Sequence, residues 1–122
     1  MSAAHIVVLV TVPSEEIALK VAEILLQQRA AACVNILPGI RSLYIWKDQR
    51  CDEQEWLLLC KTRTDQFETR FVPAVKSVHP YEVPEIIALP IIAGSSDYLA
   101  WIDEVVTPSL HFGPTQDNLT TD

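Results

Sequence analysis

The segment 79–85, HPYEVPE, gathers most of the residues of this chain that are suited to chemistry. Its polar side chains are an imidazole, a phenol and two carboxylates, from His79, Tyr81, Glu82 and Glu85. Imidazole and carboxylate ligands together suit zinc or copper, so we predict a site for Cu(II) or another divalent cation, with His79 as its metal ligand. The alternative is a rigid connection in which His79 makes structural hydrogen bonds, because no second His or Cys lies at ligand spacing.

Lys61 is the basic side chain that we predict beside this segment. It follows an apolar run and points to the same face of the predicted strand as Leu57 and Leu59. Its ammonium therefore either reaches solvent or pairs with a carboxylate. Glu82 or Glu85 would be that carboxylate. Alternatively, Lys61 anchors a small anionic ligand in a cleft.

The cysteines and tryptophans each allow a structural and a functional interpretation. Cys33 and Cys60 lie in predicted strands, where a free thiol packs as a small apolar group. Cys51 lies in a predicted polar loop, where its thiol either binds Cu(I) or zinc or has no role. The tryptophans form either a wall for ligand stacking or part of a subunit interface. They are Trp46, Trp56 and Trp101.

Motifs and charge exclude several functional classes. Glycine occurs only at positions 39, 94 and 113, so the chain has neither a P-loop nor a G-x-G-x-x-G motif, and no nucleotide cofactor is expected. The motifs G-x-S-x-G and H-E-x-x-H, which mark common hydrolases and zinc proteases, are absent too. A net charge of −7 argues against binding to nucleic acid or to an anionic membrane, since both need clustered Lys and Arg.

Size and composition predict one soluble domain. A chain of 122 residues with 49% apolar content is long enough to close one core. The apolar stretch near the N-terminus lacks a basic leader, and no run approaches the ~18 apolar residues that a membrane helix needs. Three cysteines without C-x-x-C spacing favour a reducing, cytoplasmic location.

The elements that position the candidate residues follow from the spacing of apolar side chains. Residues 6–12 are a continuous aliphatic run, typical of a strand buried on both faces. Ser14 and the two glutamates after it start a helix whose apolar face continues to Gln28. We therefore expect a strand followed by a helix.

An antiparallel hairpin is predicted next. Residues 32–46 read as a strand, and Pro38-Gly39 within it indicates a bulge or bend. Residues 47–53 have the composition of a polar loop, and 55–63 form the returning strand.

A second helix and a fourth strand complete the sheet. Asp65 and Glu68 have capping-box spacing, and the apolar periodicity after them predicts a helix. Pro73 within that pattern predicts a kink, or a helix that starts later. Residues 85–92 form the last strand, and Pro90 near its end favours the edge of the sheet.

The C-terminal part divides into a short helix and a tail. Residues 94–97 cap a helix that carries apolar side chains up to position 105. We therefore predict one domain over residues 1–107 and a flexible tail over 108–122. The order β, α, β, β, α, β plus a C-terminal helix is the α+β, ferredoxin-like split βαβ sandwich.

The strands also predict self-assembly. Several are apolar at successive positions, which places apolar side chains on both faces of the sheet. Two helices cover only one face, and the C-terminal helix can hide only part of the other. An apolar patch of that size is rarely left exposed in a monomer, so we expect a homo-oligomer with closed symmetry.

Three long blocks of this sequence closely resemble the CutA divalent-cation-tolerance family. They are AAACVNILPGIRSLYIW (30–46), WLLLCKT (56–62) and HPYEVPEIIALPI (79–91), and the resemblance covers residues 6–106. It implies a ferredoxin-like subunit, a cytoplasmic homotrimer similar to PII signalling proteins, an association with copper and other divalent cations, and no established enzyme activity.

The resemblance also implies ligand clefts between subunits. We place in them Lys61, His79, Tyr81, Glu82, Glu85 and Trp101. Some bacterial members proposed to bind copper have a cysteine and a second histidine where this chain has Val10 and Val78. Of that ligand set, only His79 remains.

Three functional hypotheses follow. The first is a non-enzymatic trimer that binds a metal ion or a small anionic ligand in its intersubunit clefts. The second is a small ferredoxin-like isomerase or proton-transfer enzyme, with His79 or Glu82 as the base beside Lys61. The third is a protein that supports partner proteins through its tail and its sheet edges.

Overall fold

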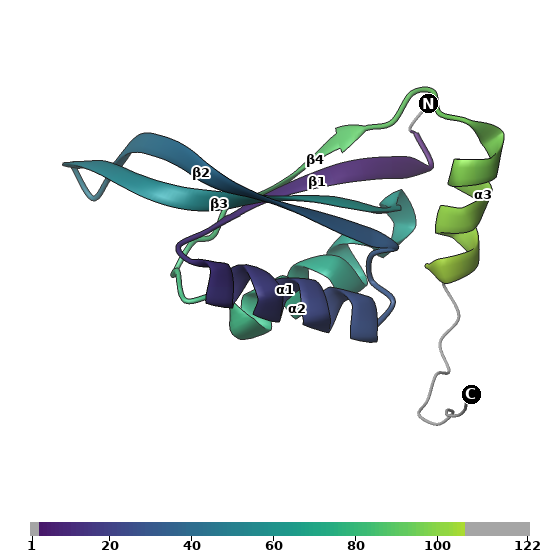
Figure 1. Ribbon diagram of the computed structural model, residues 1–122, viewed down its shortest axis with the longest axis horizontal. Coiled ribbons are helices and arrows are strands. Elements are labelled where there is room, and N and C mark those ends of the chain that lie inside the picture. The colour runs from purple at the N-terminus through teal and green to yellow at the C-terminus, as the bar shows by residue number, and fades with distance from the viewer. Residues whose placement is uncertain (1–2, 107–122) are drawn as a thin grey trace.

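The computed structural model describes residues 3–106, which form a four-stranded antiparallel sheet with two helices on one face (Figure 1). The elements are β1 (His5–Val12), α1 (Glu15–Gln27), β2 (Cys33–Trp46), β3 (Gln49–Arg63), η1 (Thr64–Gln66), η2 (Phe67–Phe71), α2 (Val72–Val78), β4 (Ile86–Pro90) and α3 (Ser96–Val105). The strand order β2-β3-β1-β4 is that of the split βαβ arrangement, so the predicted fold class is confirmed. Among the described residues, no helix has the length and apolar character needed to cross a bilayer. The predicted tail, 108–122, lies outside these residues.

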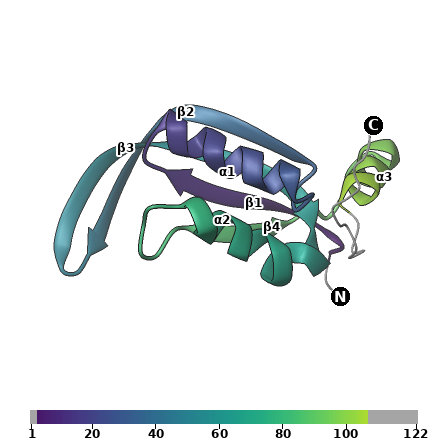
Figure 2. The same ribbon diagram turned by 90° about the horizontal axis from the view of Figure 1, so that it is seen from below.

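The core lies between the sheet and the helices α1 and α2, which lie below the sheet in Figure 1 and run side by side in the view from below (Figure 2). The central strands bury alternate side chains on this face: Ile6, Val8, Val10 and Val12 of β1, and Leu58 and Cys60 of β3. Val7 and Leu9, on the other face, are only half-buried. The prediction that β1 is buried on both faces is therefore wrong for the single protomer, because α1 and α2 cover one face only.

Helix α1 starts where the sequence predicts it. The hydroxyl of Ser14 accepts a hydrogen bond from the N–H of Ile17 (3.2 Å), which satisfies one of the free donors of the first turn. Val21 and Leu25 are fully buried against the sheet. Gln28, which we placed on the same face, is exposed because it lies at the C-cap.

Strands β2 and β3 extend beyond the sheet as a long hairpin, which reaches away from the helices in Figure 1. We call residues 40–55 the arm. The prediction of a polar loop over residues 47–53 is wrong. Trp46 pairs directly with Gln49, so the turn consists of Lys47 and Asp48 alone. Both turn residues have positive φ, 52° and 63°, as a two-residue hairpin turn matching the strand twist requires.

The predicted bulge in β2 is confirmed at the base of the arm. The pairing register shifts between Leu37 and Ile40, and Gly39 has a φ of 79°. An L side chain there would be strained, which is why glycine suits this position. The bulge turns the arm relative to the rest of β2.

Residues 64–78 form a helical segment whose winding changes along its length, from 3-10 in η1 through a π-helical η2 to α-helical in α2. The predicted capping box of Asp65 and Glu68 does not form, because Asp65 accepts hydrogen bonds from the guanidinium of Arg63 instead (2.9 Å). Pro73 lies in the first turn of α2, directly after the π-helical turn. The α-helical part therefore starts later, as in the alternative that we gave to a kink, although 3-10 and π-helical turns precede it.

The last strand and helix follow the prediction with shorter bounds. Strand β4 covers Ile86–Pro90 rather than 85–92, and it lies at the edge of the sheet. Pro90 is its last residue paired with β1, and the N–H of the next residue, Ile91, still donates to the carbonyl oxygen of His5 (2.9 Å). The nitrogen of Pro90 itself faces the free edge, where no donor is needed. Ser95 caps α3 by accepting from the N–H of Tyr98 (3.3 Å).

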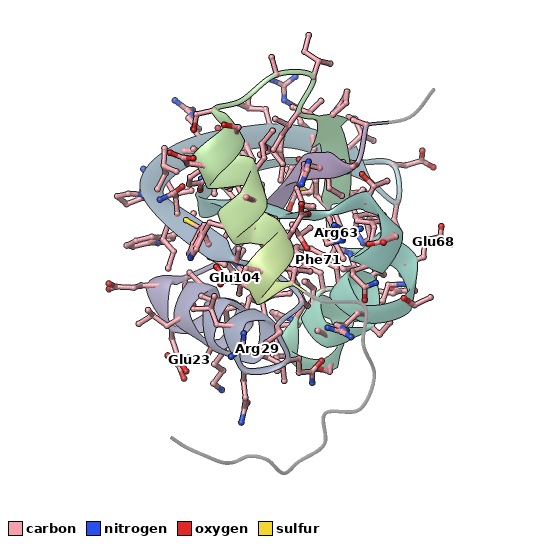
Figure 3. All side chains as sticks on the ribbon, turned by 90° about the vertical axis from the view of Figure 1, so that its right-hand side faces the viewer. Glu23, Arg29, Arg63, Glu68, Phe71 and Glu104 are labelled. Atoms are coloured by element: carbon pink, nitrogen blue, oxygen red, sulfur yellow. The ribbon has the colours of Figure 1, made fainter. Side chains whose placement is uncertain are left out.

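Helix α3 stands at one end of the sheet, away from α1 and α2 (Figure 1). Asp103 attaches it by polar contacts: its carboxylate binds His5 Nε2 (2.9 Å) and the guanidinium of Arg63, which lies beside α3 in Figure 3. Partial burial alone would raise the pKa of Asp103, but these hydrogen bonds outweigh burial and lower that pKa below its ordinary value. The ionised carboxylate is therefore the form that fixes α3.

We expect Asp103→Asn to lower the free energy of unfolding at neutral pH by up to about 1 kcal/mol, the size of a partly exposed ion pair. Because the folded-state pKa of Asp103 is depressed, this stabilisation is complete above the unfolded pKa of about 4 and disappears as pH falls through the folded value. Urea titrations of both proteins from pH 7 to acid measure the difference. Glu104→Gln, on the same helix and exposed (Figure 3), is the matched control. A difference that persists in strong acid would contradict the assignment.

Candidate functional site

A pocket of about 760 Å3 lies along the arm, between the arm and the segment 79–85. We call it the arm pocket. Its volume is typical of small-molecule sites. Its lining includes Thr11, Trp46, Glu55, Tyr81, Glu82 and Glu85.

Glu55 is the most deeply buried charged residue of the arm pocket, with only 4% of its surface exposed. The hydroxyl of Tyr81 donates a hydrogen bond to Glu55 Oε2 (2.7 Å). Burial and this acceptor both raise the pKa of Tyr81, so its phenol stays protonated and remains a donor. Among residues 3–106, no cationic side chain forms an ion pair with Glu55.

His79 is 8% exposed and connects the segment to β1. Its Nε2 lies 2.8 Å from the carbonyl oxygen of Thr11, and its Nδ1 lies 3.2 Å from the backbone N–H of Tyr81. The carbonyl accepts and the N–H donates, so the ring is the neutral tautomer that carries its proton on Nε2. Both nitrogens are therefore engaged. In this conformation His79 positions Tyr81 and presents no lone pair to a metal.

The mouth of the arm pocket carries further charged and aromatic groups. Lys47 Nζ lies 3.6 Å from Glu82 Oε1 and 5.6 Å from the centre of the Trp46 ring. Arg41, which also lines the pocket, forms a two-point ion pair with Asp52 (2.7 and 2.9 Å). The guanidinium is thus already matched by a carboxylate, and the net charge of the lining is negative.

Lys61 and Trp101 lie at the other end of the sheet. Glu55 and Lys61 point to the same face of β3, but six residues of extended strand separate them by about 20 Å. Lys61 donates to the side-chain oxygen of Asn35 and lies 4.0 Å from the thiol of Cys33. Within one protomer, therefore, Lys61 does not pair with Glu82 or Glu85. Trp101 packs against Tyr98 of α3, with ring centres 5.5 Å apart.

The predicted site residues thus form two groups within one protomer. Tyr81, Glu82 and Glu85 share the arm pocket, and His79 supports it from behind. Lys61 and Trp101 belong to the opposite end. Sequence reasoning missed Glu55. Glu55, Leu57 and Leu59 are alternate residues of one strand and so point to the same face of the sheet, which could have placed the Glu55 carboxylate on the face that the helices leave open.

The cysteines and tryptophans differ in part from the predictions. Cys60 is buried in the core, and burial raises its pKa to about 12. Cys33 is only half-buried, because it lies on the face of the sheet opposite the helices. Cys51 is half-buried within β3 rather than in a loop. The tryptophans do not form one wall, since Trp46 lines the pocket, Trp56 packs against the core and Trp101 lies on α3.

The residues of one protomer do not fit a preformed metal centre. Within residues 3–106, no three His, Cys, Asp or Glu side chains are placed to hold one ion. A tightly held zinc or copper ion needs at least three such protein ligands. His79 as a metal ligand stays a prediction that needs a rearranged histidine.

We expect His79→Ala to lower the free energy of unfolding by about 1–3 kcal/mol, because it leaves the Thr11 carbonyl and the Tyr81 N–H without their buried partner. Chemical denaturation measures this loss. Calorimetric titration with Cu(II) and Zn(II) should give the same heats for the variant and the original protein. Metal heats that vanish while stability is unchanged would instead make His79 a ligand.

Comparison with known proteins gives consistent matches along most of the chain. The family described as CutA1 divalent ion tolerance protein matches residues 6–105. The divalent-cation tolerance protein CutA of Thermus thermophilus is 52% identical over 98 residues, which are 80% of this chain and 94% of that protein.

Solved structures agree with these sequence matches. A divalent cation tolerance protein (Cut A1) from Thermus thermophilus has a TM-score of 0.81 and 50% identity, covering 84% of this chain and 99% of its own. CutA1 from Oryza sativa has a TM-score of 0.82 and 41% identity, covering 88% of this chain and 98% of its own. None of these names is that of an enzyme.

Proposed function

The chain belongs to the family of CutA1 divalent ion tolerance proteins, and on that basis we propose that it acts in divalent-cation tolerance as a non-enzymatic, cytoplasmic homotrimer that binds a small ligand in the arm pocket. Within this proposal the ligand is a cation. The lining of the pocket carries three carboxylates, whereas its one guanidinium is already paired with Asp52. A small anion, which Lys61 led us to expect, finds no free cationic group there.

The observation that carries the assembly in this proposal is the apolar face of the sheet opposite α1 and α2. We call it the open face. Cross-strand partners share a face, and here they form a continuous patch. It consists of Val7, Leu9, Leu37, Leu57, Leu59, Ile87 and Leu89.

Exposing an apolar surface as large as the open face to water is unfavourable for a single protomer. Ile87 and Leu89 are 51% and 52% exposed, and Leu37 is exposed too. In Figure 1 α1 and α2 lie below the sheet, and α3 stands at its end without covering this side. A second copy of the chain offers a matching apolar surface, which makes self-assembly the simplest cover.

A cyclic trimer would also unite the two groups of site residues. In a head-to-tail interface, one surface of a subunit meets a different surface of its neighbour. The arm pocket lies at one end of the open face, and Lys61 with Trp101 lies at the other. Packing these ends together places the expected cleft between subunits.

The enzyme alternative has less support from the protomer. His79 uses both ring nitrogens, and Glu82 is exposed and faces Lys47. Lys61 lies at the far end of the sheet from both. A proton-transfer reaction needs its acid and base within hydrogen-bond reach of one substrate, and these residues do not meet that condition.

Multi-angle light scattering at micromolar concentration tests the assembly. The expected mass is that of three protomers of 13.7 kDa each. The mass of a single protomer would refute the proposal, and the mass of two would refute the cyclic trimer.

A further inference from the structure

The carboxylate of Glu55 is not fully compensated within the protomer. It is 4% exposed and accepts one hydrogen bond, from Tyr81, on Oε2. A buried carboxylate offers about four acceptor positions and is costly to bury without a cation or several donors. Because the Glu55 carboxylate lines the arm pocket, a bound ligand can supply the cation or the hydrogen-bond donors that the protomer does not provide.

Aromatic rings form part of the surrounding walls. Tyr44, Trp46 and Tyr81 all line the pocket. The faces of such rings attract cations, and Trp is the strongest of the natural side chains in this respect. Of these rings Tyr81 bonds the buried carboxylate directly, and Trp46 lies toward the tip of the arm. Aromatic walls together with a buried carboxylate favour an organic cation, which gains from both its charge and its hydrocarbon part.

The mouth of the pocket already contains an example of this recognition. The ammonium of Lys47 is held over the Trp46 ring and beside Glu82. Both Lys47 and Glu82 are largely exposed, so this contact lies outside the buried part of the pocket. Glu85 adds a further carboxylate to the lining, and none of the ion pairs of the described residues includes it.

We propose that the arm pocket binds alkylammonium groups, one on Glu55 in its interior and a second near Glu82 and Glu85 at its mouth, which fits a diamine or polyamine. The inference rests on the proposed function only in taking the arm pocket as the ligand site. Separated carboxylates suit a ligand with separated charges, whereas a metal ion needs its ligands to converge on one point, and no three in the described residues do so.

The ammonium has two sources, a free amine or a basic side chain of another copy. In the second case the candidate is Lys61 of a neighbouring subunit. Lys61 points to the same face of β3 as Glu55, six residues further toward the end of the strand. Both sources present the same ammonium group to the pocket. A Lys61→Gln variant distinguishes a free amine from the lysine of a neighbouring subunit.

Isothermal titration of the native, full-length assembly with 1,4-diaminobutane tests the proposal, with 1,4-butanediol as the uncharged ligand of equal length. We expect Glu55→Gln to weaken amine binding at least tenfold. Glu23→Gln removes the same charge from the exposed surface of α1 (Figure 3), a helix that contributes nothing to the lining of the pocket, and should change affinity less than twofold. Trp46→Leu, at the exposed mouth, should weaken binding severalfold without affecting the fold.

Each outcome decides one point. Amine binding that appears only in Lys61→Gln supports the ammonium site and assigns its natural occupant to the neighbouring lysine. No binding in either protein, equal binding of the diol, or equal losses in Glu55→Gln and Glu23→Gln would overturn the inference. Tighter binding of Mn(II) or Ca(II) at the same carboxylates would overturn it in favour of a metal. Light scattering on the same samples shows separately whether the trimer of the proposed function exists.

Discussion

Leu89→Asp should convert the assembled protein into single chains of 13.7 kDa, and Ile87→Asp should do the same. Both side chains lie on the open face with about half of their surface exposed, so the protomer can fold around either aspartate. In an assembly that covers this face, the new carboxylate would be buried without a partner. Such a charge costs several kcal/mol at each copy of the interface, which exceeds what most assemblies can absorb.

Leu19→Asp is the matched control. Leu19 is 51% exposed, like Ile87 and Leu89, but it lies on the outer side of α1, away from the open face. It should keep the mass of the original protein in light scattering. If Leu89→Asp also kept that mass, the open face would not be the interface. Circular dichroism on each variant shows whether its fold is retained.

The sheet could be predicted from the sequence because its strands and helices are marked by local signals. Ser14 and the glutamates after it define the start of α1, and Gly39 marks the bulge of β2. The length of the arm could not be predicted in the same way. Residues 47–53 are polar because both faces of the arm are exposed, and polar composition alone does not distinguish an exposed strand from a loop.

The candidate site was predicted only in part, for a physical reason. Residues close in sequence, such as Tyr81 and Glu82, were grouped correctly because a short proline-stiffened segment keeps them together. Within the protomer Lys61 meets Asn35 and not the predicted carboxylates, because which residues meet across a sheet depends on strand register and not on periodicity. Glu55 was overlooked because its hydrogen-bond partner, Tyr81, is distant in the sequence and meets it only in the folded chain.

Helix α3 is anchored independently of the main core. Ile102 and Val106 are fully buried, but they pack with Ala32 in a small cluster separate from the one between α1, α2 and the sheet. Its other attachments are polar, through Asp103 and through Arg29, whose guanidinium donates to the Val105 carbonyl (3.4 Å). An element held by so few apolar contacts can open while the rest of the fold stays intact.

Ile102→Ala should therefore weaken the docking of α3 by about 2–5 kcal/mol, the usual cost of emptying a fully buried aliphatic site. Hydrogen exchange should show lost protection in α3 and retained protection in β1 and β3. Leu58→Ala, which is equally buried but in the main core, should lower protection throughout. If both variants lost protection everywhere, α3 would belong to the same cooperative unit as the sheet. Because α3 carries Trp101 and Tyr98, the Ile102 variant should also weaken a trimer whose cleft uses that end of the open face.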